Sequence, residues 1–384
     1  MNTSTATCTL FCCGDVMTGR GIDQILPQPV APELHEAYVK DARRYVTLAE
    51  EANGEIAHPV DRRYIWGDAL PILDQTAPDL RLVNLETSVT TSDDYWRAKG
   101  IHYRMHPGNM SCLTTAAIHC CALANNHVLD WGHAGLAETI EVLRGHHIQT
   151  AGAGLTADEA RAPAVFEHAA GKRIAVFACA MPDAGVPPDW AAGPHRPGVY
   201  YVDAPSTGAA DELAAVIRER THADDLVVLA VHWGSNWGYD IDPGHVAFAH
   251  ALVDAGAVDL VCGHSSHHVR PFEVYRNKLI LYGCGDFLND YEGISGHERY
   301  RGDLTLMYFP KLDAASGDLQ ALEMVPLKLR RLRLETAAEP DVVTLRRLLN
   351  ETGEDFGTRV DRRHDRLYWS ADRRPHPPAM EQHP

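Results

Sequence analysis

Basic residues are scarce in this sequence, and their scarcity excludes one class of partner. The 384 residues include 35 lysines and arginines against 52 aspartates and glutamates, for a formal net charge of −17. Nucleic-acid binding needs clustered lysine and arginine to neutralise phosphates, so we expect no nucleic-acid surface. The basic clusters at residues 328–333 and 359–374 alternate with acidic or apolar residues, which is typical of solvated faces.

Long apolar runs are also missing. No stretch approaches the roughly 18 consecutive apolar residues of a membrane-spanning helix. Residues 1–10 carry neither a basic segment nor a long apolar segment, and these two segments define a secretory signal. We therefore expect a cytoplasmic protein with no membrane span.

Paired metal-binding cysteines are absent as well. The nine cysteines form no Cys-x-x-Cys motif, which argues against a structural zinc ribbon. An odd number of cysteines placed mostly in apolar runs suits reduced, buried thiols better than disulfides. The cysteines in apolar runs are Cys12, Cys13, Cys120, Cys121, Cys179 and Cys262.

Segments typical of strands and helices alternate over the first two-thirds of the chain, and strands dominate afterwards. Strands are predicted at residues 7–13, 79–83, 118–122, 148–151, 173–180, 225–231, 258–262, 279–283, 303–309 and 319–329. Helices are predicted at residues 134–146, 207–220, 244–255 and 341–349. Residues 33–80 look helical in pieces, interrupted at Pro59 and Pro71. This order favours an α/β fold with sheet in the core and helices outside.

Residues 123–132, Leu-Ala-Asn-Asn-His-Val-Leu-Asp-Trp-Gly, form the most informative stretch. They place two amides, one imidazole and one carboxylate between a predicted strand and a predicted helix. A capped helix start with Asp130 as the N-cap would explain part of this pattern. Similar polar clusters follow five other predicted strands. Because open α/β sheets bind ligands at the carboxyl ends of their strands, we expect the clusters to form one site.

The residue types in these clusters are those that bind a divalent metal. Carboxylate, amide oxygen and imidazole ligands are available from Asp15, Asn84, Glu86, Asn125, Asn126, His127, Asp130, His232, His264, His267 and Asp286. The pair His264 and His267 on a glycine-led turn is the sharpest signal, and His268 is expected to face away. Since oxygen ligands rival the imidazoles, we predict Ca²⁺, Mg²⁺ or Mn²⁺ rather than Zn²⁺.

Five ordered motifs resemble those of the capsule-biosynthesis (CapA-type) family, which belongs with the calcineurin-like metallophosphoesterases. They span roughly residues 8–290 and read Gly14-Asp15-Val16-Met17, Asn84-Leu85-Glu86, Ala124-Asn125-Asn126-His127, His232-Trp233-Gly234 and Gly263-His264-x-x-His267. The resemblance implies a calcineurin-like four-layer α-β-β-α sandwich with mixed sheets. We expect a metal-dependent catalytic domain over residues 1–335, and a C-terminal helix with a mobile tail over residues 336–384.

The resemblance also implies roles for individual residues. Those facing the metal or its waters would be Asp15, Asn126, His232, His264 and His267, with His127 as the catalytic imidazole. Glu86 adds a carboxylate to the predicted metal ligands. Acid–base chemistry is predicted for His127, His267, Asp15, Asp130 and Asp286. Substrate contacts are predicted at Arg20, Arg104, Trp233, Asn236 and Trp237, although the aromatic residues of loop 233–239 are explained equally well by rim packing.

Two motifs depart from the usual phosphoesterase pattern. Met17 stands where an Asp-x-His motif has its histidine, and Asn84 and Glu86 stand where a Gly-Asp pair is usual. A thioether is a poor ligand for a hard cation, so the two-metal clamp used in phosphate ester hydrolysis is disfavoured. One metal with histidine and carboxylate groups remains, a set suited to proton transfer.

Three functions are compatible with such a site. Our first hypothesis is a metal-dependent peptide epimerase of the lasso peptide (RiPP) type, which would convert an L residue to D at its Cα. The alternative is a CapA-type factor in poly-γ-glutamate capsule biosynthesis, or a metal-dependent phosphoesterase or hydrolase. A non-enzymatic binder of an anionic polymer is the third, and the acidic net charge argues against it. The partner is thus a peptide or polyglutamate substrate.

Overall fold

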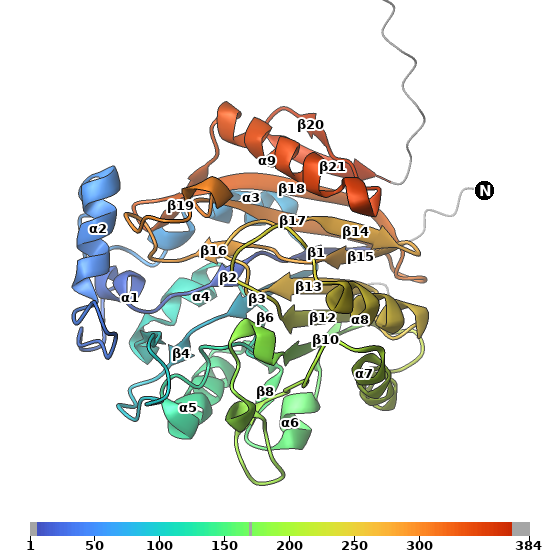
Figure 1. Cartoon of the computed structure of the whole chain (residues 1–384), viewed down its shortest axis with the longest axis horizontal. Coiled ribbons are helices and arrows are strands. Elements are labelled where there is room, and N and C mark those ends of the chain that lie inside the picture. The colour runs from blue at the N-terminus through green and yellow to red at the C-terminus, as the bar shows by residue number, and fades with distance from the viewer. Residues whose placement is uncertain (1–5, 169–170, 371–384) are drawn as a thin grey trace, which may run out of the picture.

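The computed structural model describes residues 6–168 and 171–370. The predicted mobile tail beyond residue 370 lies outside the described residues. Figure 1 shows strands filling the centre of the molecule, with helices arranged around them. Within the described residues, the strands form an eleven-stranded sheet, a six-stranded sheet and two short two-stranded pairs.

The larger sheet joins both ends of the chain. Its parallel strands are β1 (Thr7–Phe11), β2 (Asp15–Val16), β3 (Leu80–Leu85), β6 (Cys120–Ala122), β7 (Gln149–Ala151) and β16 (Asp286–Leu288). Its antiparallel strands are β17 (Leu304–Asp313), β18 (Leu319–Arg330), β19 (Arg333–Thr336), β20 (Asp361–Arg363) and β21 (Arg366–Ser370). β1 lies between β3 and β17, at the centre of this sheet.

The smaller sheet has a parallel centre and antiparallel edges. Its strands, in spatial order, are β14 (Phe272–Tyr275), β15 (Lys278–Leu281), β13 (Leu260–His264), β12 (Leu226–His232), β10 (Arg173–Ala180) and β9 (Ala164–Glu167). The short pairs are β4 (Ser88–Val89) with β5 (Arg104–Met105), and β8 (Ala153–Gly154) with β11 (Gly198–Val199).

Alternation along β10 separates two layers of core. Its even-numbered residues pack in one cluster with the larger sheet. The odd-numbered residues Ala175, Phe177 and Cys179 pack instead beneath α7 (Thr207–Arg220) and α8 (Pro243–Asp254). Successive side chains of a strand point to opposite faces, so the smaller sheet is covered by the larger sheet on one face and by helices on the other.

The remaining helices are α1 (Gly21–Ile25), α2 (Arg43–Asn53), α3 (Ala69–Thr76), α4 (Ser111–Thr115), α5 (Gly132–Gly145), α6 (Ala157–Arg161) and α9 (Glu339–Thr352). Of these, α6 packs against β8 and β11, and the others lie around the larger sheet. α5 packs against β7 and α9 against β18 and β21. The predicted class, an α/β sandwich of mixed sheets with helices outside, is confirmed. Among the helices of the described ranges, none combines the length and apolarity needed to cross a bilayer.

Two local features differ from the sequence-based expectation. The prediction that Pro71 interrupts the helical region is wrong, because Pro71 is the third residue of α3. The first-turn N–H groups of a helix have no intrahelical partner, so proline removes nothing there. The hairpin β20–β21 is absent from the predictions, and it extends the larger sheet with residues beyond 335. The division of the chain at residue 335 stays a prediction.

All nine cysteines lie within the described residues, where they are buried and free of disulfides. This confirms the expectation of reduced thiols. Burial in the apolar core raises the pKa of Cys120 and of Cys179 well above the ordinary value. These two thiols are therefore protonated and inert at neutral pH.

Candidate metal centre

Polar residues at or next to the ends of the parallel strands meet where the two sheets face each other. Asp15 pairs in register with Asn84 on one side and with Asp286 on the other. On the smaller sheet His232 pairs with His264. The sheets are joined at this point, because His264 Nδ1 lies 2.8 Å from Asp15 Oδ1. The predicted clusters therefore form one site, as expected from their positions at strand ends.

Asp15 is held as an ionised carboxylate. Its Oδ1 accepts hydrogen bonds from Asn84 Nδ2 at 2.8 Å and from His264, and its Oδ2 accepts from the Ser265 N–H at 3.0 Å. Burial works to raise the pKa of Asp15, but its hydrogen bonds with His264 and Asn84 hold it below the ordinary value. Since the Nδ1–H of His264 donates to this carboxylate, its Nε2 is left as an acceptor for a cation.

A glycine is required beside this carboxylate. A Cβ on Gly14 would lie 2.1 Å from the carbonyl oxygen of Gly285. The Asp15 N–H donates to that same carbonyl at 2.9 Å. The Gly-Asp order of the first motif therefore allows the start of β2 to approach the chain just before β16, and this approach places Asp15 next to Asp286.

Three buried groups converge on a common point. Asp15, Glu86 and His232 each offer one ligand atom, and these atoms all lie within 4.8 Å of one another. Of the groups of this kind within the described residues, it is the one whose members are all buried. Burial raises the pKa of Glu86, as does the charge of Asp15, and burial lowers the pKa of His232 to about 3.

Several buried polar atoms here have no hydrogen-bond partner. They are Oε2 of Glu86, Oδ1 of Asn126, and both ring nitrogens of His232. Burying such groups unpaired costs roughly 1–3 kcal/mol each, and native proteins rarely leave them so. Carboxylate, amide oxygen and neutral imidazole are the donors that a divalent cation takes. The residues present therefore fit a metal ion, with Asp15 and His264 completing the set.

A histidine–carboxylate pair lies beside this cluster. His127 Nδ1 is 2.6 Å from Asp130 Oδ2, and His127 Nε2 is 3.8 Å from Glu86 Oε1. Asp130 also accepts from Lys99 Nζ at 2.6 Å and from the Tyr103 N–H at 2.7 Å. Burial lowers the pKa of His127 to about 4, so its imidazole is neutral at pH 7. The N-cap residue of α5 is Trp131, whose side chain makes no capping hydrogen bond. The interpretation of Asp130 as the N-cap is therefore wrong.

A second histidine–carboxylate pair comes from the other side of the site. His267 Nδ1 lies 3.0 Å from Asp286 Oδ1, and Asp286 Oδ2 accepts from Asn289 Nδ2 at 2.8 Å. His267 Nε2 is 3.0 Å from Asn236 Nδ2. Although burial alone would lower the pKa of His267, the neighbouring Asp286 raises it above the ordinary value. The two imidazoles thus lie in opposite environments: burial favours the neutral form of His127, whereas Asp286 favours the charged form of His267.

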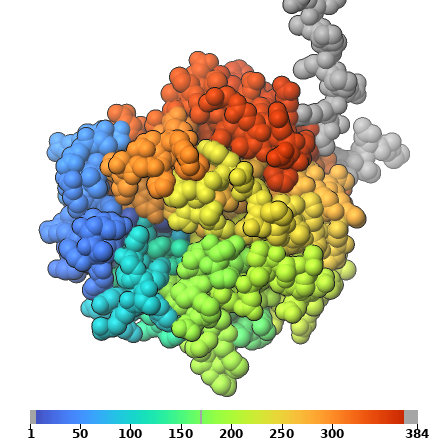
Figure 2. Space-filling model, in the orientation of Figure 1, coloured from blue at the N-terminus to red at the C-terminus, as the bar shows by residue number. Residues whose placement is uncertain are grey.

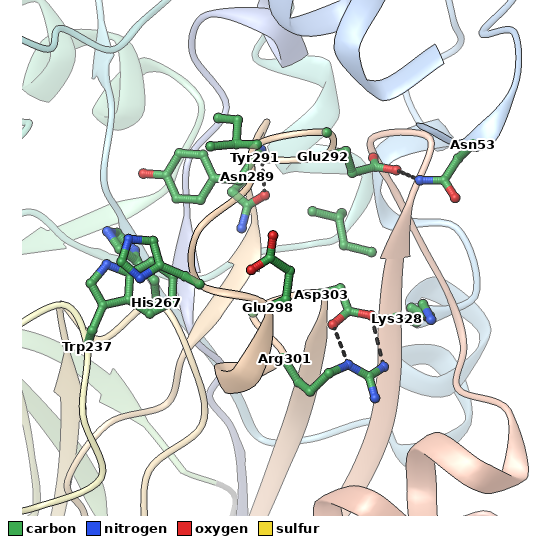
Figure 3. Close-up of a pocket in the computed structure, with 15 residues that line it drawn as sticks. Asn53, Trp237, His267, Asn289, Tyr291, Glu292, Glu298, Arg301, Asp303 and Lys328 are labelled. Carbon is green, nitrogen blue, oxygen red and sulfur yellow. Dashed lines mark hydrogen bonds and ion pairs between the residues drawn. The ribbon is translucent and has the colours of Figure 1, made fainter. Parts of the chain in front are cut away.

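A cavity of about 400 Å³ opens beside His267, and Figure 3 shows its lining. Its wall includes Trp237, which stacks on His297 with ring centroids 4.0 Å apart, and Tyr291, whose ring meets His267 edge-on at 5.2 Å. In the surface view of Figure 2 the yellow segment that includes residues 235–240 borders the orange segment that includes residues 292–300. The cavity therefore lies between two loops, next to one of the predicted catalytic histidines.

Arg20, a predicted substrate contact, is engaged inside the protein. Its guanidinium is buried, donates to Glu36 at 2.8 Å and to Asp290, and lies over the Tyr45 ring at 3.8 Å and the Tyr103 ring at 4.4 Å. Its donors are thus committed to partners that hold the loops around the site together. A substrate role for Arg20 stays a prediction.

Arg104 and Trp233 are also buried. Arg104 Nη1 donates to Asp93 at 2.8 Å, and Trp233 Nε1 donates to the Tyr282 carbonyl at 3.0 Å within the core beneath α8. For Trp233 this geometry supports packing over substrate contact. The other two predicted contacts, Asn236 and Trp237, lie next to His267, where Trp237 lines the cavity.

Met17 stands where the Asp-x-His motif of the resembled phosphoesterases has its histidine. It is fully buried, and its Sδ lies 3.7 Å from the Tyr291 hydroxyl. A thioether in this contact offers nothing to a hard cation, so Met17 adds no ligand to the group formed by Asp15, Glu86 and His232.

Sequence reasoning missed the role of two residues. Lys99 falls in a polar loop, residues 90–105, yet its ammonium contacts Asp130, the Asn126 carbonyl and, at 3.2 Å, His127 Nδ1. Asn289 orients Asp286. The three-residue spacing from Asp286 to Asn289 was an available signal, whereas nothing local indicates the partner of Lys99.

The metal-free protein is expected to lose stability as the pH falls from about 6.5 towards 3. His232 has an ordinary pKa of 6.5 that burial lowers to about 3, so in this range the unfolded chain binds a proton that the folded protein excludes. The free energy of unfolding should fall by up to about 1.4 kcal/mol per pH unit for this one group. Urea unfolding at pH 4 to 7 measures it. A His232→Asn variant should show a shallower pH dependence, and an unchanged slope would contradict the assignment.

Comparison with known proteins identifies one family and several relatives to which this chain is similar. The family described as bacterial capsule synthesis protein PGA_cap matches residues 9–291. A probable polyglutamine synthesis accessory protein of Mycobacterium tuberculosis is 48% identical over 360 residues, which cover 94% of each chain. The PGA biosynthesis protein CapA of Bacillus subtilis is 27% identical over 267 residues, 68% of this chain and 67% of that one. The capsule biosynthesis protein CapA of Bacillus anthracis is 28% identical over 279 residues, 72% of this chain and 64% of that one.

Proposed function

The chain belongs to the bacterial capsule synthesis protein family PGA_cap, and on this premise we propose that it is a metal-dependent hydrolase of a polyglutamate chain, acting as an accessory factor in that polymer's synthesis. The observation that carries the proposal is that Glu86 Oε2 and both ring nitrogens of His232 are buried without a hydrogen-bond partner, between two oriented histidines. The match to the PGA_cap family and to the two CapA proteins confirms the CapA-type resemblance. The relatives' names refer to polyglutamine, PGA and capsule synthesis, and they give no support to a lasso peptide epimerase.

A bound divalent cation would supply a Lewis acid that polarises the scissile carbonyl. The residues that would hold it are Asp15, Glu86, Asn126, His232 and His264. Its identity is proposed as Ca²⁺, Mg²⁺ or Mn²⁺, since the three oxygen donors outnumber the two imidazoles.

The proton transfers follow from the different environments of the two histidines. His127 is neutral, its Nδ1 is held by Asp130, and its Nε2 faces Glu86. It is therefore placed to take a proton from an attacking water. His267 has a raised pKa and is oriented by Asp286, so it is placed to give a proton to the departing amine. Pairs of titratable groups whose pKa values are pushed apart commonly divide the base and acid roles in this way.

The proposal is tested with purified full-length protein, poly-γ-glutamate and each divalent metal in turn. We expect stoichiometric metal, shortening of the polymer on a sizing column, one new amine per cut, and loss of both effects with chelator. Intact polymer at every metal concentration would contradict hydrolysis. Incorporation of solvent deuterium at Cα without shortening would favour the epimerase instead, because only carbon-acid chemistry exchanges that proton.

A further inference from the structure

The charged side chains that line the cavity beside His267 differ in how they are neutralised. Arg301 and Lys328 share two carboxylates: Arg301 donates to Asp303 at 2.8 Å and to Asp341 at 2.7 Å, and Lys328 Nζ lies 3.2 Å from Asp303. Arg301 uses Nε and Nη2 for these contacts, so its Nη1 is left for a ligand. Both cations are about one-third exposed.

Glu298 is an acidic group in the same cavity without a cation. Its carboxylate accepts from the Gly296 N–H at 3.0 Å, and among the described residues no ion pair reaches it. Figure 3 shows this carboxylate pointing into the cavity. Arg301 follows three residues later on the same turn. An unpaired carboxylate and a guanidinium therefore face one space without being close enough to neutralise each other.

The cavity also offers surface for a short apolar stem. Trp237 forms part of one wall, and Leu329 and Ile294 contribute aliphatic surface. The half-exposed side chain of Ile294 stands at the edge of this space. A volume of about 400 Å³ falls in the range of about 300–1,000 Å³ usual for small-ligand pockets.

We propose that this cavity binds the amino-terminal head of a γ-linked glutamyl chain, whose free α-ammonium and α-carboxylate share one carbon; this inference rests on the proposed function. The ammonium would pair with Glu298 and the carboxylate with Arg301. The methylene groups would lie along Trp237 and Leu329, which directs the γ-amide towards His267. The chain is thereby engaged from its amino end.

The overall charge of the protein favours binding of the amino-terminal residue of the polymer over binding of the many carboxylates along its length. The net charge of −17 repels a run of carboxylates, and both cations of the cavity already share acidic partners. The amino-terminal head is the one part of a γ-linked chain in which an ammonium balances the carboxylate. Its binding therefore needs no basic surface, only one group of each sign at the right separation.

The test measures binding of γ-linked tri-glutamate by calorimetry, with a free or an acetylated amino terminus, to the metal-loaded wild type and to Glu298→Gln. The wild type should bind the free form at least about 10-fold more tightly, the effect expected for one charge-assisted hydrogen bond. Glu298→Gln should bind both forms equally weakly. Glu298 is exposed, so the variant should fold, and Glu354→Gln, on an exposed turn elsewhere, should behave as wild type.

The outcomes separate this inference from the proposed function. Equal binding of free and acetylated tri-glutamate by the wild type overturns the proposal that the cavity is a site for the amino-terminal head, here called the head site. If chelator-sensitive shortening of poly-γ-glutamate persists at the same rate in Glu298→Gln and on acetylated polymer, the function stands without the head site. If the wild type neither binds glutamyl chains nor shortens them with any metal, both fall.

Discussion

Replacing Asp15 with asparagine is expected to remove the bound cation and to lower hydrolysis of a glutamyl chain by at least about 100-fold. Asp15 is ionised and accepts from Asn84, His264 and the Ser265 N–H. An asparagine has one accepting oxygen and would point its NH₂ group at donors. It would also remove the negative charge from the point where Glu86 and His232 converge.

Elemental analysis after dialysis, together with the rate of polymer shortening, measures this effect. The matched control is Asp211→Asn, an exposed carboxylate on α7, which should keep full metal and activity. Thermal unfolding adds a readout that does not depend on substrate. Metal at 100 times its Kd should stabilise the wild type by about 2.7 kcal/mol and leave Asp15→Asn unchanged. Stoichiometric metal in Asp15→Asn would remove this residue from the ligand set.

Replacing His127 with alanine is expected to slow hydrolysis by about 10²- to 10⁴-fold while the metal stays bound, because a general base contributes about that much. His127 lies outside the group of atoms that converge on the metal point. Its Nδ1 is bound to Asp130, and its Nε2 is 3.8 Å from Glu86. The His127→Ala variant therefore loses the proposed general base and keeps the proposed metal ligands.

The informative comparison is between rate and metal content in the same preparation. A His195→Ala variant, which changes an exposed histidine, serves as the control and should match the wild type in both. Loss of metal together with activity in His127→Ala would reassign His127 as a ligand. Full activity would exclude it from the mechanism.

The longer strands that lead to the site were predictable because they are buried on both faces, whereas β2 and β16, which carry Asp15 and Asp286, are two and three residues long and were not predicted as strands. Residues 173–180 form β10 with the predicted bounds, since a central parallel strand is a near-continuous apolar run. The polar residues after such runs then had to meet at one edge of the sheets. By contrast, β20 and β21 are short, and β20 consists entirely of charged residues. β21 is placed by pairing with β18, and β20 by pairing with β21, which no local pattern encodes.

The direction of individual side chains was less predictable. Trp233 directly follows a strand in a ligand-like motif, yet packing against Tyr282 and His245 turns it into the core. Arg20 finds its partner Asp290 across 270 residues of sequence. Both outcomes depend on tertiary neighbours, whereas the position of a strand end depends on residues within one short run.

The position of β1 has a consequence for synthesis on the ribosome. Thr7–Phe11 is made long before one of its partners, because β1 pairs on one side with β17, formed by Leu304–Asp313. One row of its backbone hydrogen bonds must therefore wait until most of the chain has emerged. Asp15 similarly waits for His264 and Asp286. Nascent chains of this protein should thus expose an incomplete, apolar sheet edge for most of translation, the kind of surface that chaperones protect.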